Sequence, residues 1–464
     1  MKNFYLEDTI AALSTPCGTG GIAVIRISGP DAFSSAGRLF RSPGGSSREF
    51  VHYRAMYGHA VRPSDGSFID EAIFLPMKAP HSYTTEDTVE IQCHGGSSCV
   101  YEILGALFSV GVRQALPGEF TKRAFLGGRI DLLQAEAVMD IIGAKSRDAL
   151  ENAEEQLEGK YSEELSQFKE SIARAAAAVE APLDYPDEDL YAMDSDESAA
   201  MLDALAENAA LMLAKAEGGR LCRDGAKVSL IGRPNAGKSS ILNMLLGASR
   251  AIVTDIAGTT RDTIEESCSI RGALVNLCDT AGIHETDSII EKIGIEKTIA
   301  AADESDIIIA VLDSSSEISD EDREVLRIAS ESGKPFFAVL NKSDLPSLID
   351  SDGISSEYGC SCISISARTG SGSDELEKLI YAKIMEIFPS GASSRFSASG
   401  RCREALSSIA SDLREAADAA RAGLPGDICA VPLRAAVQSL EALTGEKYDE
   451  DILDRVFSEF CIGK

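Results

Sequence analysis

Short apolar runs separated by turn residues make up the first 128 residues of the chain. Residues 22–28 (IAVIRIS) and 88–92 have the strand-like composition typical of these runs, and Gly, Ser and Pro fall between them. This pattern predicts an α+β domain over residues 1–128.

A helical pattern follows from residue 129 to about residue 225, where Ala, Glu and Leu recur at spacings of three and four. The helices expected from this spacing cover 134–142, 149–165 and 168–181. Pro182 and the acidic segment 184–189 are expected to interrupt the helical stretch.

Apolar strands alternate with helices between residues 226 and 389, in the runs VSLIG, LVNLCD, DIIIAVLD and FFAVLN. Such alternation predicts a mostly parallel sheet with helices on both faces. Helical spacing then returns over 401–422, 433–443 and 450–460. We expect these last helices to pack against the earlier helical stretch.

The whole pattern predicts a multi-domain α/β protein, because 464 residues exceed what one hydrophobic core supports. Its segments are an α+β domain (1–128), the first half of a helical domain (129–225), an inserted α/β domain (226–389) and the second helical half (390–464). The Ser- and Gly-rich residues 390–400 form the expected return linker.

The charge balance limits the possible partners. Lys and Arg total 44 against 74 Asp and Glu, giving a net charge of −30, so the averaged field repels nucleic-acid phosphates. A nucleic-acid partner would need a local basic patch. The nearest concentration is Lys122, Arg123 and Arg129, which we expect to form salt bridges or to contact a small ligand rather than nucleic acid.

Cysteine usage and hydropathy point to a cytoplasmic protein. The 11 cysteines show no paired framework, which predicts reduced thiols, and Cys360 and Cys362 lack a second pair at zinc spacing. We expect neither an export signal at the N-terminus nor a membrane span, since no run approaches about 20 apolar residues.

A phosphate-binding motif follows the apolar strand 228–231. The run GRPNAGKSS fits GxxxxGKS through Gly232, Gly237, Lys238 and Ser239. In this motif glycines let backbone N–H groups face the phosphates, the lysine neutralises the β and γ oxygens, and the serine hydroxyl binds magnesium.

Three further elements follow in the order that guanine recognition requires. Asp279 opens DTAG, a motif that typically lies beside the magnesium ion and the γ-phosphate. A threonine of GTTRD can complete the set of magnesium ligands. In NKSD, the Asp344 carboxylate can accept bonds from the guanine ring N–H and the exocyclic amine, which adenine does not offer as a pair. Ser366 and Ala367 fit the loop whose amide contacts the guanine oxygen. Together the motifs predict a Ras-like P-loop GTPase domain.

One position departs from the Ras pattern, because Ile283 stands where a Gln would orient the attacking water. Arg261, an ion or a second subunit are the alternatives for stabilising the transition state, and sequence spacing leaves them open.

Several motifs together resemble the MnmE (TrmE) family of tRNA modification GTPases along essentially the whole chain. They are TPCGTGGIAVIRISG, EIQCHGG, PGEFTKRAF, GRPNAGKSS, IVTDIAGTTRD and the terminal FCIGK. The resemblance implies that residues 1–128 form a folate-binding and dimerisation domain. It also implies that a tetrahydrofolate derivative, in its 5-formyl or methylene form, contacts Arg26, Glu90, Arg129 and Lys464.

For the nucleotide site, the resemblance implies Mg²⁺ on Ser239 and Thr260 and K⁺ on Asn235, Thr254, Ile256 and Thr259. It implies that Glu291 orients the attacking water and that Lys238 is a second catalytic residue. The residues then expected to contact GTP are Asn235, Ala236, Gly237, Lys238, Ser239, Ser240, Thr254, Asp255, Ile256, Ala257, Gly258, Thr259, Thr260, Asp279, Thr280, Ala281, Gly282, Asn341, Lys342, Asp344, Ser366 and Ala367.

The implied reaction adds an aminomethyl or carboxymethylaminomethyl group to carbon 5 of the wobble uridine of certain tRNAs. The implied assembly is a homodimer that joins a flavoprotein, MnmG (GidA), in a heterotetramer. FAD and NADH belong to that partner, since this chain has no GxGxxG after a strand. Cys461 of the terminal CIGK is implied as a catalytic thiol, although a cysteine beside Phe457 and Phe460 is also typical of a buried apolar residue.

A second interpretation fits the same nucleotide motifs. A regulatory GTPase switch of the ribosome-assembly type would bind and hydrolyse GTP without covalent tRNA chemistry. The terminal CIGK and the folate-like N-terminal segments favour the modification enzyme, because a switch needs neither a thiol nor a one-carbon cofactor.

Overall fold

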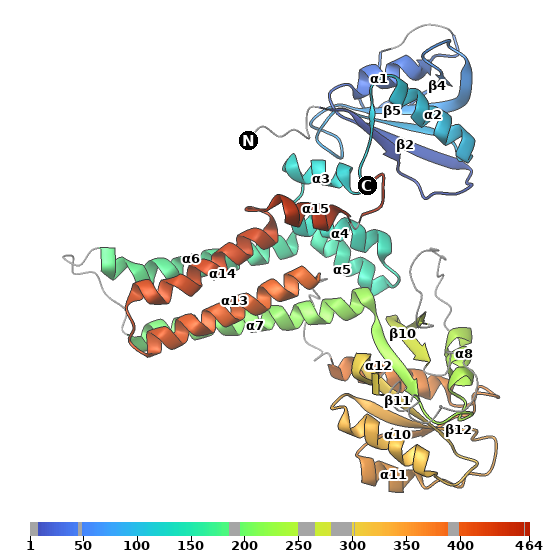
Figure 1. Ribbon diagram of the computed structural model, residues 1–464, viewed down its shortest axis with the longest axis vertical. Coiled ribbons are helices and arrows are strands. Elements are labelled where there is room, and N and C mark those ends of the chain that lie inside the picture. The colour runs from blue at the N-terminus through green and yellow to red at the C-terminus, as the bar shows by residue number, and fades with distance from the viewer. Residues whose placement is uncertain are drawn as a thin grey trace. The chain divides into compact units, whose positions relative to one another are not determined.

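The computed structural model describes residues 8–44, 49–184, 195–248, 265–279, 299–300, 302–387, 399–458 and 460–464 (Figure 1). The chain forms two compact units, each assembled from segments that are distant in sequence. Unit 1 comprises Met1–Met139, Leu157–Met193 and Leu424–Lys464, and unit 2 comprises Asp140–Gln156 and Asp194–Gly423.

A seven-stranded sheet is the centre of the N-terminal part of unit 1. In spatial order its strands are β3 (Phe40–Arg41), β4 (Met56–Val61), β5 (Phe68–Met77), β6 (Thr88–His94), β2 (Ile22–Ser28), β1 (Ile10–Leu13) and β7 (Arg113–Gln114). All neighbours pair antiparallel except β1 and β7.

Helices α1 (Ala32–Leu39) and α2 (Ser97–Ser109) pack on one face of this sheet, which Figure 1 shows. Alternate strand residues such as Ile25, Phe74 and Ile91 point into the resulting core and are fully buried. This confirms the α+β composition expected for the N-terminal segment, because strand alternation gives the sheet one apolar face.

The remaining helices of unit 1 come from three parts of the chain. They are α3 (Glu119–Leu126), α4 (Leu132–Gly143), α6 (Lys160–Asp184), α14 (Gly426–Thr444) and α15 (Glu450–Ser458), with α4 continuing into unit 2. Helix α6 lies along α14, and α15 packs near α3 (Figure 1). Phe125 of α3, Leu132 of α4 and Phe457 of α15 belong to one apolar core.

Unit 2 contains a second helix pair and a six-stranded sheet. Helices α7 (Ser195–Asp224) and α13 (Gly400–Arg421) lie side by side (Figure 1) and are bridged by Arg421–Asp203 at 2.7 Å and Arg403–Glu217 at 3.3 Å. The late helices therefore pack against the earlier helical stretch, as expected, with α13 on α7 in unit 2 and α14 on α6 in unit 1.

The sheet of unit 2 is mostly parallel, which confirms the expected Ras-like α/β arrangement. Its order is β13 (Ser361–Ser364), β12 (Phe336–Asn341), β11 (Ile307–Asp313), β8 (Ala226–Ile231), β10 (Ala273–Asp279) and β9 (Glu265–Ile270), and only β9 runs antiparallel. Helices α8 (Lys238–Ala248) and α12 (Ser373–Ile387) pack with one apolar cluster, and α10 (Asp320–Glu331) and α11 (Ser351–Tyr358) with another.

Three helix boundaries differ from the sequence expectation. The helix expected over 149–165 is two helices, α5 (Arg147–Leu157) and α6, because Gly159 has a left-handed φ of 86°. Helix α6 also continues to Asp184, beyond Pro182, where an interruption was expected. Helix α14 begins at Gly426 and contains Pro432 inside it, so the expected start at residue 433 was wrong.

Candidate functional site

The phosphate-binding loop lies at the carboxyl edge of the unit 2 sheet. β8 ends at Ile231 between the parallel strands β11 and β10, so the loop starts at the centre of that edge. Ligands of open α/β sheets bind at this edge. Within the loop, Asn235 has a φ of 62° and Gly237 a φ of 102°. A Cβ at Gly237 would overlap the Asn341 side-chain nitrogen, so the tight loop requires glycine there.

Lys238 is positioned by the loop that precedes it. It is the first residue of α8 and is 6% exposed, and its Nζ donates to the carbonyl oxygens of Gly232 at 2.8 Å and Arg233 at 3.1 Å. The helix start and the ammonium group therefore face the same loop, which is the arrangement that favours an anionic ligand. Ser239 and Ser240 follow in the first turn of α8.

Asn341 connects the phosphate loop to the base-recognition loops. Its Nδ2 donates to the Ala236 carbonyl at 2.9 Å, and its Oδ1 accepts from the Ala367 N–H at 3.1 Å. Asn341 is 3% exposed and ends β12, while Ser366 and Ala367 follow β13. The structure thus brings together three motifs that the sequence separates.

Asp344 is the residue expected to read the base. Its Oδ1 accepts from the Ser366 hydroxyl at 2.7 Å, and this hydrogen bond holds the pKa of the carboxyl below its ordinary value. Asp344 is therefore ionised at neutral pH, as an acceptor for two guanine N–H groups must be.

Asp313, which ends β11, is a residue that the motif analysis missed. Its Oδ2 accepts from Lys342 Nζ at 2.6 Å and lies 4.0 Å from the Arg233 guanidinium. Burial alone would raise the pKa of Asp313, but the Lys342 and Ser315 hydrogen bonds outweigh it and lower the pKa. The available sequence signal was an acidic residue at the end of a buried strand between two nucleotide motifs.

Part of the expected nucleotide site lies outside the described residues. Asp279 ends β10 opposite Leu230 of β8, so its backbone is at the same sheet edge. The other expected residues, which lie in 254–260 and 280–282, together with Glu291, are outside the described part of the chain.

A second polar group gathers in unit 1 around the Tyr83 ring. Arg26 on β2 and Glu90 on β6 are register partners, and the Arg26 Nη2 and Nε atoms donate to Glu90 Oε1 at 2.8 and 3.0 Å. The guanidinium carbons of Arg26 and Arg129 lie 5.2 and 5.0 Å from the centre of the Tyr83 ring. Arg129 is also fixed by its donation to the Tyr83 carbonyl at 2.8 Å.

The C-terminal residues join this group. The Phe120 N–H donates to the Lys464 carbonyl at 3.2 Å, and the Gly118 N–H donates to that of Cys461 at 3.4 Å. Burial lowers the pKa of the Lys464 ammonium, and the Arg26 charge lowers it further while Glu90 opposes. Cys461 is exposed, so it is not the buried apolar residue that its phenylalanine neighbours suggested.

Tyr83 and Phe120 were missed by the sequence analysis. The Phe120 ring centre lies 5.7 Å from the Arg26 guanidinium carbon, and Phe120 is fully buried. Tyr83 and Arg129 also line an open cleft of about 680 Å³, together with His52, Tyr53 and His81. Phe120 lies within the motif PGEFTKRAF, whereas Tyr83 stands seven residues before the motif EIQCHGG, and no pattern in the sequence marked it.

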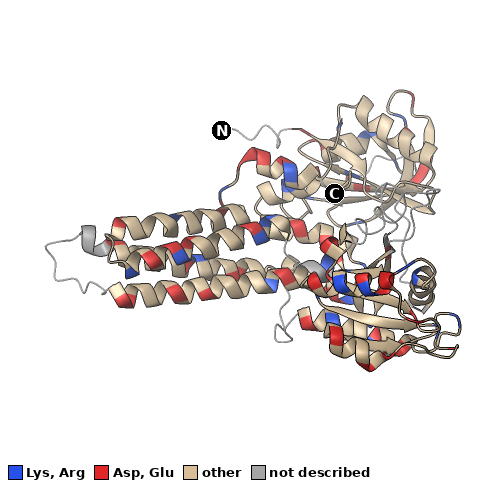
Figure 2. Cartoon of the chain, turned by 60° about the horizontal axis from the view of Figure 1, so that its bottom comes forward, with Lys and Arg blue, Asp and Glu red and all other residues tan. Residues whose placement is uncertain are grey.

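The basic residues of α3 are used internally, as expected. Lys122 Nζ pairs with Asp454 at 2.6 Å, and the Arg123 side chain is 1% exposed and pairs with Asp8 at 2.6 Å and Glu119 at 3.0 Å. Figure 2 shows acidic residues distributed along the long helices. None of the described helices combines the length and apolar composition that crossing a membrane requires.

Two family models of known proteins match the chain, and a solved structure matches part of it. The family model "GTP-binding protein TrmE N-terminus" matches residues 9–129, and "MnmE helical domain" matches residues 132–461. The G domain of the T. maritima FeoB iron transporter is 29% identical, with a TM-score of 0.27, and the match covers 35% of this chain and 98% of that one.

Full-length relatives match as well. A "tRNA modification GTPase MnmE" of Heliobacterium modesticaldum is 42% identical over 98% of this chain and 99% of the relative. Relatives of the same name from Clostridioides difficile and Natranaerobius thermophilus are 41% and 40% identical, each over 99% of this chain and 100% of the relative. The chain therefore belongs to the MnmE (TrmE) family and is a GTP hydrolase involved in tRNA modification.

Proposed function

We propose that the chain couples GTP hydrolysis to the addition of an aminomethyl or carboxymethylaminomethyl group at carbon 5 of a wobble uridine, with a tetrahydrofolate derivative as one-carbon donor. The observation that supports this most is the gathering of Arg26, Glu90, Arg129 and Lys464, which are far apart in sequence, around the side of unit 1 that holds Tyr83.

The residues of this group fit a folate in their chemistry. A pterin ring is planar and carries N–H donors, and a carboxylate such as Glu90 accepts from such donors. Arg26 bonds Glu90 through Oε1, so Oε2 can accept a pterin N–H. The cations Arg129 and Lys464 suit the glutamate carboxylates of the folate tail. When bound, the folate supplies the one-carbon unit, and this chain's residues hold and orient it.

In the nucleotide site, Lys238 and the loop amides bind the phosphates and Asp344 selects guanine. Ser239 and Thr260 are the proposed Mg²⁺ ligands, and Asn235, Thr254, Ile256 and Thr259 the proposed K⁺ ligands. Of these, Asn235 lies within the phosphate-binding loop and has a left-handed φ of 62°. A cation beside the β and γ oxygens would stabilise transition-state charge where Ile283 replaces the Ras glutamine, and Glu291 would orient water.

The proposed assembly is a homodimer that works with the flavoprotein MnmG, which carries FAD and uses NADH, on tRNA. The net charge of −30 and the internal pairing of Lys122 and Arg123 support a division in which the partner supplies much of the tRNA-binding surface.

The test is mass analysis of tRNA nucleosides from cells that lack this protein. The proposal expects the C5-modified wobble uridine to disappear and to return with the wild-type gene but not with an Arg26→Ala variant. Arg62→Ala is the matched control, because Arg62 lies in the same domain and makes an exposed pair with Glu102 at 2.7 Å and a hydrogen bond to the Ser67 hydroxyl at 2.9 Å. Unchanged wobble uridines would favour the regulatory switch instead.

Cys461 has its own test within this proposal. Its exposure beside Lys464 supports a thiol that reaches the reacting groups. A Cys461→Ser variant should hydrolyse GTP normally and lose tRNA modification. Full modification by this variant would reject the role of the thiol.

A further inference from the structure

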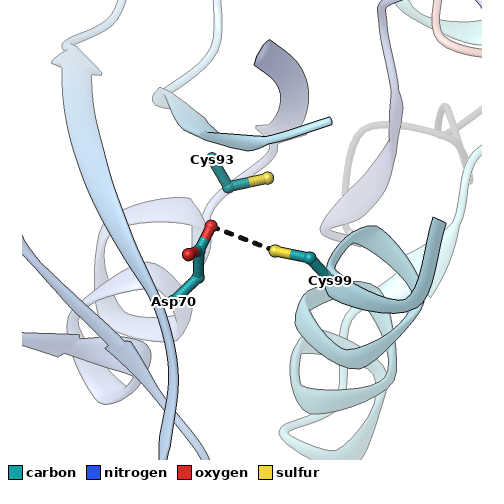
Figure 3. A group of neighbouring side chains, drawn as sticks. All are labelled: Asp70, Cys93 and Cys99. Carbon is teal, nitrogen blue, oxygen red and sulfur yellow. Dashed lines mark hydrogen bonds between the residues drawn. The ribbon is translucent and has the colours of Figure 1, made fainter. Parts of the chain in front are cut away.

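Three side chains with metal-binding atoms meet at one end of the unit 1 sheet, apart from the group around Tyr83. Asp70 is on β5, Cys93 is on β6 and Cys99 is in the first turn of α2. One carboxylate oxygen and the two sulfur atoms all lie within 4.8 Å of one another. Figure 3 shows the three side chains converging from these separate elements.

The Asp70 carboxylate is held in place by its neighbours. His94 Nδ1 bonds Oδ1 at 2.7 Å, while the His94 N–H and the Cys99 thiol donate to Oδ2 at 2.8 and 3.1 Å. The Asp70 side chain is only 12% exposed. A largely buried negative charge therefore faces two sulfur atoms, which is an environment that attracts a cation.

The thiols are also placed for metal binding. Cys93 is buried and Cys99 half-buried, and the Cys99 thiol already donates to Asp70 Oδ2 at 3.1 Å, so the two sulfur atoms and the carboxylate share one enclosed site. A divalent metal would take the place of the two thiol protons, as it does at thiolate sites generally.

We propose that Asp70, Cys93 and Cys99 form a zinc site, with His94 orienting the Asp70 carboxylate and water as the fourth ligand. Two sulfur ligands and one carboxylate favour zinc over magnesium or calcium. Zinc lies about 2.3 Å from thiolate sulfur and about 2.0–2.2 Å from a carboxylate oxygen, so tetrahedral ligands are roughly 3.3–3.8 Å apart. The distance of 3.1 Å from Cys99 Sγ to Asp70 Oδ2 is already close to this separation, and all three ligand atoms lie within 4.8 Å of one another.

The proposed site would join β5, β6 and the start of α2. Its ligands come from two strands and one helix, so bound zinc should make local opening of this end of the sheet less frequent. The cysteine pair alone does not reveal the site, because the third ligand stands 23 residues before Cys93 in the sequence.

Zinc titration of the tag-free, reduced protein against a chromophoric chelator tests the proposal. We expect one tightly held zinc per chain, and for Co²⁺ added in place of zinc a thiolate-to-cobalt absorption band typical of tetrahedral coordination. Cys93→Ser and Cys99→Ser should each weaken zinc binding at least about 100-fold, and His94→Gln about 10- to 100-fold, as expected for a residue that orients a ligand.

Cys17→Ser and Cys360→Ser are the matched controls and should bind zinc as the wild type does, since neither belongs to the cluster. The cobalt spectrum is measured on the wild-type protein, so the test does not depend on the folding of any variant. Absence of zinc uptake, equal affinity in the Cys93 and Cys99 variants, or a Cys93–Cys99 disulfide whose reduction restores no zinc binding would each overturn the proposal.

Discussion

We propose that guanine selection rests on the side chain of Asp344. The Ser366 hydroxyl bonds one oxygen and keeps the carboxylate ionised, and Asn341 holds the neighbouring loop against the phosphate loop. A base that lacks the paired donors of guanine leaves this charge without partners, which is costly in a site built for hydrogen bonding.

Asp344→Asn should change the preferred base from guanine to xanthine while the protein stays folded. An amide offers one donor and one acceptor, which matches xanthine, whose carbonyl replaces the guanine amine. We expect GTP affinity to fall about 100-fold, because hydrogen bonds to charged groups contribute about 1.5–3 kcal/mol each, and XTP affinity to rise. Fluorescent-nucleotide titration measures both, and an Asp350→Asn variant, altered at the α11 N-cap instead, is the control. Unchanged GTP affinity in the Asp344 variant would contradict the role of Asp344.

Glu119 predicts a pH dependence of stability. Its side chain is 4% exposed and accepts from Arg113 at 2.6 Å and Arg123 at 3.0 Å. Burial raises the pKa of Glu119, but the Arg113, Leu116 and Arg123 bonds outweigh it and lower the pKa. The stabilisation is therefore complete above the unfolded-state pKa of about 4.3 and is lost as the pH falls through the lower, folded-state pKa.

Glu119→Gln should destabilise unit 1 by about 1.5–3 kcal/mol at pH 7, because it removes one charged hydrogen-bond partner of buried Arg123, which keeps Asp8 and Glu86. The difference from wild type should shrink below about pH 4.3. Hydrogen exchange of the α3 amides measures it. Glu102→Gln, which removes the 50% exposed partner of Arg62, should cost less than about 1 kcal/mol. A difference that is constant with pH would refute the linkage.

At the scale of single residues, motifs made of neighbouring residues could be predicted from the sequence, and contacts between distant segments could not. Lys238, Asn341 and Asp344 are recognisable because neighbouring residues define their motifs. Tyr83, Phe120 and Asp313 were missed, because their places depend on which strands and loops become neighbours in the fold.

The C-terminal tetrapeptide, residues 461–464, packs against the N-terminal part of unit 1. Ile462 pairs with Pro117, and the Ser14 hydroxyl donates to the Gly463 carbonyl at 2.9 Å. Gly463 has a φ of 95°, and a Cβ there would overlap the Leu13 carbonyl. Only glycine therefore permits this path of the chain.

Gly463→Ala should release the tail, because the left-handed conformation alone costs roughly 1–3 kcal/mol and the overlap adds to it. Faster removal of the last residues by carboxypeptidase measures the release, and tRNA modification should fall while GTP hydrolysis stays. Gly423→Ala is the control, since Gly423 also has a positive φ of 66° but open space around it. Equal digestion of the Gly463 variant and the wild type would contradict the docking.

Element types followed from periodicity better than element boundaries did. The parallel sheet of unit 2 was expected from its apolar strands, since both of its faces are covered. The break at Gly159 and the passage of α14 through Pro432 depend on local backbone geometry and packing, which spacing of apolar residues does not encode.

At the scale of the whole molecule, the potassium hypothesis gives the clearest prediction. If K⁺ stabilises the transition state in place of an arginine finger, replacing K⁺ by Na⁺ at constant ionic strength should slow GTP hydrolysis at least about 10-fold, because the smaller ion fits the same ligands poorly. Single-turnover hydrolysis in the two salts measures this. An Asn235→Ala variant should lose the difference between the salts, and equal wild-type rates would exclude the ion.

The two compact units divide the work that we propose, with nucleotide chemistry in unit 2 and the folate group and thiol in unit 1. The family relation to tRNA modification GTPases applies to both, since the relatives are matched over nearly their full length. GTP hydrolysis in unit 2 is required whether the chain is a modification enzyme or a regulatory GTPase switch.

Binding of GDP and ADP to the purified protein, measured by calorimetry with Mg²⁺ and K⁺ present, tests the account most directly. Because Asp344 accepts from a donor pair that adenine lacks, GDP should bind at least about 100-fold more tightly than ADP. Equal affinity for the two nucleotides would contradict it.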